Sequence, residues 1–142
     1  MDNLSYPNKV ILKAFISIIQ ESSFTIKRYL PSTDEYWYEI IDDTIEYVKN
    51  LQSFEEQNDI YKISANLLYK IAKRHEMGDG NKRSSVIVTY CFCLVNNYYI
   101  RNPQRLKDLA KSLAATKGRV NEDLIKRRAA EKLKNIIAPV IQ

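Results

Sequence analysis

Apolar residues recur at helical spacing along most of this 142-residue chain. The spacing predicts a first helix over about residues 9–21 and a third over about residues 58–74. A second helix is expected after Pro31, with Ser32 as its N-cap and Glu35 closing a capping box. The apolar face of the first helix would consist of Val10, Ile11, Ala14, Phe15, Ile18 and Ile19.

The longest apolar stretch covers residues 86–95 and is rich in β-branched and aromatic side chains. Periodicity does not separate a buried helix from a buried strand in such a run. No other segment has a convincing strand pattern, so a strand here would lack a partner. We therefore predict a central buried helix from about residue 81 to residue 96.

Polar caps and prolines mark two more helices. Asn102 caps one whose first residue is Pro103 and which ends before Gly118. Asn121 caps another, which is expected to continue to about Ala138. The chain is therefore predicted to be all-α, a compact bundle of about six helices around the central buried one.

Composition narrows the class of protein. The chain is 45% hydrophobic and 27% charged, as is usual for a folded domain, and no repeat or linker divides residues 1–142, so we expect a single domain. No apolar run reaches the roughly 18 residues of a membrane span. The N-terminus lacks a signal-peptide pattern, which predicts a cytoplasmic protein. Cys91 and Cys93 are expected to be buried free thiols.

Charge is distributed unevenly. The formal net charge is +5, but residues 1–60 hold five Lys or Arg against eleven Asp or Glu, whereas residues 101–142 hold eleven against four. A basic half favours an anionic partner. Nucleotide phosphate, nucleic acid and an acidic protein all satisfy that condition.

Residues 75–83, His-Glu-Met-Gly-Asp-Gly-Asn-Lys-Arg, concentrate the candidate chemistry. They include the only histidine and two of the three glycines, and they lie between two predicted helices. The segment should therefore be a tight loop leading into a helix N-terminus, where unpaired N–H groups and the helix dipole favour an anion. Gly78 and Gly80 would let the backbone approach a phosphate closely.

The polar side chains of this segment suit phosphate transfer. Lys82 and Arg83 are phosphate donors. Asp79 is a hard oxygen ligand for a phosphate-bound magnesium ion. His75, whose ordinary pKa lies near 6.5, is the natural general base near neutral pH.

The same nine residues resemble the signature of the Fic/Doc family, His-x-Phe-x-Asp/Glu-Gly-Asn-Gly/Lys-Arg. Lys82 stands where AMP-transferring members carry Gly and Doc-type members carry Lys. The resemblance covers these nine positions and, less closely, the flanking helices. The residues that match the signature in register are His75, Asp79, Gly80, Asn81 and Arg83.

This resemblance implies a role for each matched residue. His75 would deprotonate a Ser, Thr or Tyr hydroxyl of a target protein, and Asp79 would hold Mg²⁺ against the phosphates of ATP or another nucleotide. Gly80 and Asn81 would donate hydrogen bonds to those phosphates. Lys82 and Arg83 would stabilise charge on the transferred group, as phosphoryl transfer requires.

Two departures from the signature bear on the reaction. Met77 replaces the usual Phe, and Val86 stands where AMP-transferring members have a second Arg. Together with Lys82, Val86 favours a Doc-like enzyme that transfers phosphate from ATP, with AMP transfer as the alternative. The β-hairpin flap of the family is expected, by position, within residues 23–31. The resemblance implies a toxin whose target is a translation factor. Because the chain has no inhibitory Ser/Thr-x-x-x-Glu-Gly/Asn motif, the resemblance also implies that a separate antitoxin protein restrains it.

Simpler interpretations stay open. His75 could cap a helix C-terminus, and residues 78–81 could form an ordinary turn. The chain could be a Fic-like fold without catalysis that acts as a binding partner. It could also be a basic module that binds nucleic acid or protein, but the two C-terminal helices supply cations without the aromatic residues that stack on bases. Binding of Mg-ATP separates these hypotheses, because the nucleic-acid module predicts none.

Overall fold

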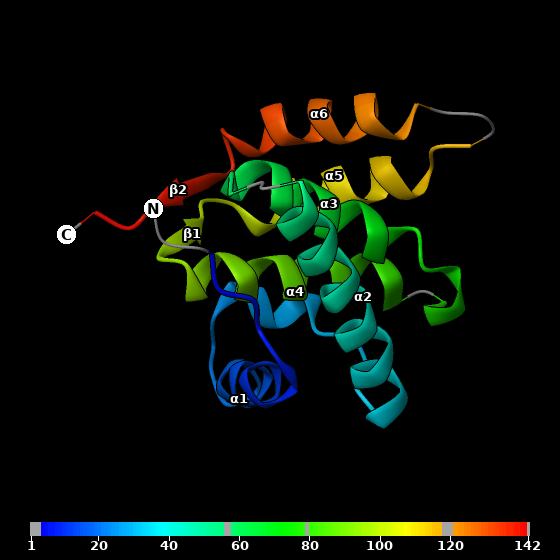
Figure 1. Ribbon diagram of the computed structural model, residues 1–142. Helices are drawn as coiled ribbons and strands as arrows, with labels where there is room; N and C mark the ends of the chain where they lie inside the picture. Colours follow the sequence, from blue (N-terminus) through cyan, green and yellow to red (C-terminus); the bar gives the residue numbers. More distant parts are fainter. Residues whose placement is uncertain (1–3, 56–57, 79, 118–120, 142) are drawn as a thin grey trace.

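Helix α4 (Gly80–Val95) runs through the middle of the protein in a computed structural model that describes residues 4–55, 58–78, 80–117 and 121–141 (Figure 1). Its apolar side chains from Val86 to Val88 and from Cys91 to Cys93 are almost completely enclosed. The ambiguous apolar run is therefore a buried helix, as predicted. Burial on several sides explains why its apolar residues show no single face.

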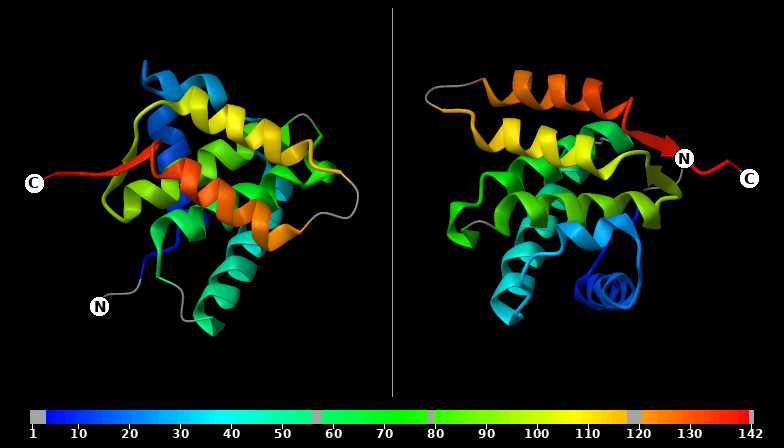
Figure 2. Two further views of the ribbon diagram at one scale, coloured as in Figure 1. Left: turned by 90° about the horizontal axis from the view of Figure 1, so that it is seen from above. Right: turned by 180° about the vertical axis from the view of Figure 1, so that it is seen from behind.

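The described residues form six α-helices in a compact, essentially all-α bundle, as the sequence predicted. Helix α3 packs against α4 and α6, while α2 packs against α3 and α5 against α4. Seen from behind, α6, α5 and α4 follow one another from top to bottom, with α1 below them (Figure 2). Within the described residues, no helix combines the length and apolarity needed to cross a bilayer. The remaining helices are α1 (Lys9–Gln20), α2 (Glu35–Phe54), α3 (Ile60–Ala72), α5 (Pro103–Ala114) and α6 (Glu122–Leu133).

Helix α1 begins where the sequence predicted but buries a different face. Leu12, Ile16 and Ile19 point into the core, whereas Val10 is 74% exposed and Ile18 is 62% exposed. The predicted apolar face was wrong because this helix carries apolar residues on more than one side. Neighbouring elements cover only one side of this helix, on which Leu12, Ile16 and Ile19 lie four and three residues apart.

Helix α2 starts later than the predicted capping box. Its N-cap is Asp34, whose carboxylate accepts a hydrogen bond of 2.8 Å from the backbone N–H of Trp37. Ser32 precedes the helix and does not cap it, so the predicted cap was wrong by two residues. Aspartate directly before the helix satisfies the same unpaired backbone donors that the serine was expected to satisfy.

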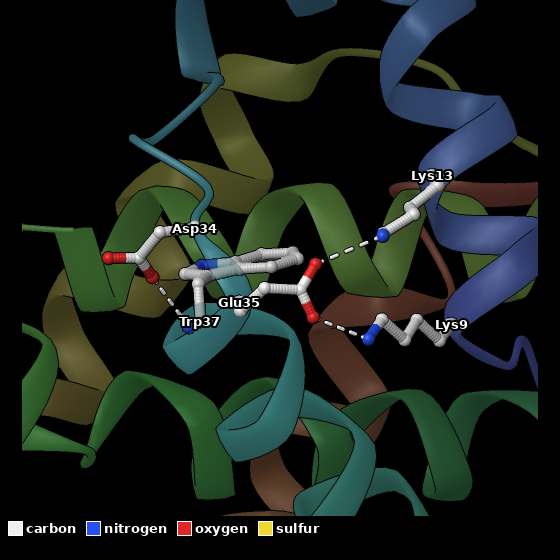
Figure 3. Close-up of polar contacts among 5 residues, drawn as sticks. All are labelled: Lys9, Lys13, Asp34, Glu35 and Trp37. Carbon is white, nitrogen blue, oxygen red and sulfur yellow. Dashed lines mark hydrogen bonds and ion pairs between the residues drawn. The ribbon is translucent and has the colours of Figure 1, made fainter.

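Glu35, the first residue of α2, joins this helix to α1 (Figure 3). Its two carboxylate oxygens accept hydrogen bonds from Lys9 at 2.5 Å and from Lys13 at 3.1 Å. These bonds lower the pKa of Glu35. All three side chains are exposed, so the ion pairs contribute little to stability, and apolar packing holds α1 in place.

Two short strands were missed by the sequence analysis. Strands β1 (Tyr98–Ile100) and β2 (Ile137–Pro139) pair antiparallel, with Tyr99 opposite Ala138. Helix α6 accordingly ends at Leu133 rather than near residue 138. Strands of three residues are too short to show an alternating pattern, so periodicity did not predict them.

Residues 23–31 do not form the expected β-hairpin flap. They contain the short 3₁₀ helix η1 (Thr25–Tyr29), which packs against α1 and α4. Ile26 and Tyr29 are buried in the core. The segment is therefore part of the packed body of the protein, and the flap prediction was wrong.

Cys91 and Cys93 are free and buried in α4, as predicted, and burial raises the pKa of both thiols to about 12.

At pH 8 the native thiols of Cys91 and Cys93 should react with a disulfide reagent about a thousandfold more slowly than the same thiols in denaturant, because the thiolate is the reactive form. Their rate should still rise about tenfold per pH unit from 8 to 10. Absorbance measurements of thiol release would check this, and a rate that levels off near pH 9 would contradict it.

Candidate functional site

The turn between α3 and α4 is tight and depends on one glycine. It contains the 3₁₀ helix η2 (His75–Met77), followed by Gly78 at φ +58°. A side chain at Gly78 would meet nothing within 4 Å, so glycine is required there by the backbone conformation and not by lack of space. The predicted loop into a helix N-terminus is therefore present.

His75 lies at the start of η2 with an exposed side chain. Its backbone is held on both sides, since its N–H donates to Lys73 O and its carbonyl accepts from Gly78 N–H, each at 3.0 Å. His75 itself does not line the cleft described below, whereas the next two residues, Glu76 and Met77, do. Its neighbour Glu76 accepts a hydrogen bond of 2.8 Å from Arg74, which lowers the pKa of Glu76.

Asn81 points into the protein rather than toward solvent. Its amide Nδ2 donates a 2.6 Å hydrogen bond to Ala72 O at the end of α3, and only 3% of the residue is exposed. Its Oδ1 is buried and has no hydrogen-bond partner among the described residues. In this structure the Asn81 amide therefore joins the two helices through one of its N–H groups. The expected hydrogen bond from this amide to a phosphate stays a prediction.

Asp79, the predicted magnesium ligand, lies outside the described residues. Among the residues that the structure does describe, no three His, Cys, Asp or Glu side chains gather in a group that could hold a metal ion. A magnesium ion bound through one carboxylate and the phosphates of its ligand needs no such group. The described residues are thus compatible with a metal that arrives with a nucleotide.

A cleft of about 710 Å³ opens at the N-terminus of α4. One side comes from α2 and the segment before it, with Asp34, Tyr36 and Trp37 in its wall. The other side comes from Gly80, Lys82 and Arg83 of the nine-residue motif and from Lys107 of α5, with Glu76 and Met77 contributed by η2. The cleft therefore combines an aromatic wall with a cationic one.

The carboxylates that line the cleft, Asp34 and Glu76, do not pair with its cationic wall, and Glu76 is paired with Arg74 instead. Lys82, Arg83 and Lys107 form no ion pair with any carboxylate in the described part of the chain. Partial burial, followed by the nearby charge of Arg83, lowers the pKa of Lys107. Together with the positive end of the α4 dipole, these three side chains make the cleft a site for an anion.

Trp37 is fixed against the first turn of α4. Its indole Nε1–H donates a 2.8 Å hydrogen bond to Ser84 Oγ, and that hydroxyl donates at 2.5 Å to Gly80 O. Trp37 is only 5% exposed, so its ring forms part of the floor of the cleft. The side chains of Asp34 and Trp37 lie together at the start of α2 (Figure 3). This pair of hydrogen bonds sets the position of the aromatic wall relative to the cationic one.

Sequence reasoning did not assign Tyr36, Trp37, Ser84 or Lys107 to the site, because none of them belongs to a recognisable motif. Lys107 and Lys111 stand one helical turn apart, which marks a basic side of α5 but does not reveal that this side meets the motif. Only the packing of α5 against α4 brings Lys107 to the cleft.

No protein-family model matches this chain, and no curated protein matches it. The function is therefore argued from the residues of the cleft and of the nine-residue motif.

Ser84→Ala should lower the free energy of unfolding by about 1–3 kcal/mol, because it leaves the buried indole N–H of Trp37 without its acceptor. Emission from Trp37, the only tryptophan, should also shift to longer wavelength as water reaches the ring. Denaturant titration and fluorescence would measure the two effects.

Ser85→Ala is the matched control. It removes the 2.6 Å hydrogen bond from Ser85 Oγ to Lys82 O on the same helix but touches no atom of Trp37. Its emission should match that of the wild type. Unchanged emission in Ser84→Ala would show that the bond between Trp37 and Ser84 does not hold the ring.

Proposed function

We propose that this chain is a Doc-like transferase that moves a phosphoryl group from ATP to a hydroxyl of a target protein. The observation that carries the proposal is the cationic wall of the cleft, where Lys82 and Arg83 of the motif face the same space as Lys107 and none of the three is paired with a described carboxylate. Such a wall supports binding of a multiply charged anion.

The size and the lining of the cleft support a nucleotide as that anion. Its volume of about 710 Å³ lies in the range typical of small-molecule pockets, about 300–1,000 Å³. Tyr36 is 59% exposed in the aromatic wall, where its ring is accessible to a base, while the phosphates would lie near Gly80 and the cations. When bound, magnesium would neutralise phosphate charge, with Asp79 as its protein ligand.

The protein's own residues then account for the transfer. The imidazole of His75 accepts the proton of the attacking hydroxyl as the hydroxyl oxygen bonds to the γ-phosphorus of ATP and ADP leaves. The exposure of His75 allows a protein substrate to reach it from solvent. Lys82 and Arg83 offset the negative charge that develops on the transferred group. In phosphoryl transfer, positioning and charge neutralisation supply most of the catalysis.

AMP transfer is the alternative for the same cleft. The position of Val86 favours phosphate as the transferred group, because its side chain is completely buried. In this chain the third position after Arg83 faces the core, and a cation placed there would be buried among apolar residues. The second arginine that the resemblance associates with AMP transfer therefore has no equivalent on α4.

His75→Ala should abolish transfer without unfolding the protein, because the side chain is exposed and the cost in stability should stay within about 0.5 kcal/mol. The measurement is labelling of lysate proteins with ATP that carries isotope at either the α- or the γ-phosphate, with magnesium present. Label that comes only from the γ-phosphate and requires His75 is expected.

Lys111→Ala is the control, because Lys111 is exposed and does not line the cleft. It should label as the wild type does, and its melting temperature should match that of His75→Ala. Label from the α-phosphate would show that the enzyme transfers AMP and not phosphate. Undiminished label in His75→Ala would refute the role of His75 as base, and absence of any label would favour a binding protein without catalysis.

A further inference from the structure

Lys107 reaches the cleft from a different helix than the other cations of its wall. Lys82 and Arg83 belong to the first turn of α4, whereas Lys107 projects from α5, which packs against α4. The three positive charges therefore border the cleft from two helices. A ligand that bears several negative charges along its length can contact the cations of both helices at once.

The ammonium group of Lys107 lies over an aromatic ring and forms no ion pair with a described carboxylate. Its Nζ lies 5.9 Å from the centre of the Tyr29 ring. Tyr29 in turn donates a hydrogen bond of 2.7 Å to Gln104, whose amide donates at 2.9 Å to Asp108. Asp108, the carboxylate next to Lys107 in sequence, is thus engaged by Gln104.

The desolvation of Lys107 also favours an anionic ligand. Partial burial is the main cause of its lowered pKa, so the charged form is held in an unfavourable environment. A phosphate in the cleft would offset that cost, because opposite charge stabilises the ammonium. On α4, the position three residues after Arg83 holds the buried Val86 and offers no cation. The additional cation of this wall therefore comes from α5.

We propose that Lys107 is a phosphate-positioning residue that completes an oligophosphate clamp with Lys82 and Arg83. The clamp binds the phosphate chain of a nucleoside triphosphate from two helices, with Lys82 and Arg83 contributed by α4 and Lys107 contributed by α5. The inference rests on the proposed function for the identity of the nucleotide, but the binding of the phosphate chain is measurable by itself.

The test uses inorganic tripolyphosphate and isothermal titration calorimetry on the full chain. Lys107→Met keeps the aliphatic stem and removes the charge, so binding should weaken about tenfold, the loss expected for one charge-assisted hydrogen bond. Lys107→Arg should restore binding to within about threefold of the wild type, which a purely structural role of the stem would not explain. Melting temperatures would verify that all variants are folded.

Lys111→Met is the matched control, one turn along the same helix, exposed and outside the cleft lining. It removes the same charge and should change binding by less than about threefold. The inference is overturned if Lys107→Met binds as well as Lys111→Met, if Lys107→Arg is as weak as Lys107→Met, or if the wild type does not bind tripolyphosphate.

The labelling assay separates this inference from the proposed function. If tripolyphosphate binding requires Lys107 but no label depends on His75, the phosphate clamp is supported and the proposed transferase activity is refuted. If label requires His75 but tripolyphosphate binding is the same with and without the Lys107 charge, the transferase activity is supported and the clamp is refuted.

Discussion

The burial of α4 is the constraint on which the rest of the structure depends. A helix enclosed on several sides satisfies its own backbone hydrogen bonds, but its first turn must be held by its neighbours. Asn81 joins that turn to the end of α3, and Ser84 joins it to Trp37 of α2. Residues that would otherwise belong to a loose loop, Gly80 and Lys82 among them, are therefore positioned by the packing of the core.

The fold could be predicted from sequence where a single pattern determines burial. The long apolar run specified the burial of residues 86–95, and the lack of a partner strand of similar length made a helix the consistent choice. Helix α1 has apolar residues on several sides but only one covered stripe, and the choice of Leu12 over Val10 depends on neighbours that the sequence does not reveal. The β1–β2 pair escaped prediction for the same reason, since two three-residue strands exist only through contacts between distant segments.

The candidate site divides in the same way. Its cationic first turn could be predicted because the residues are adjacent in sequence and their types are informative. The direction of Asn81 could not, because competition between the solvent and the carbonyl of Ala72 for its amide is settled by packing. The aromatic wall and Lys107 come from helices that precede and follow the motif, and no spacing rule connects them.

The position of α3 between α4 and α6 has a consequence for how the protein is synthesised. All residues of the cleft precede α6 in the chain, so a ribosome completes them while one apolar side of α3 still lacks its cover. That side is exposed to chaperones and to other nascent chains until residues 122–139 emerge and β2 pairs with β1. The chain is therefore open to aggregation in the interval between translation of the cleft and translation of α6.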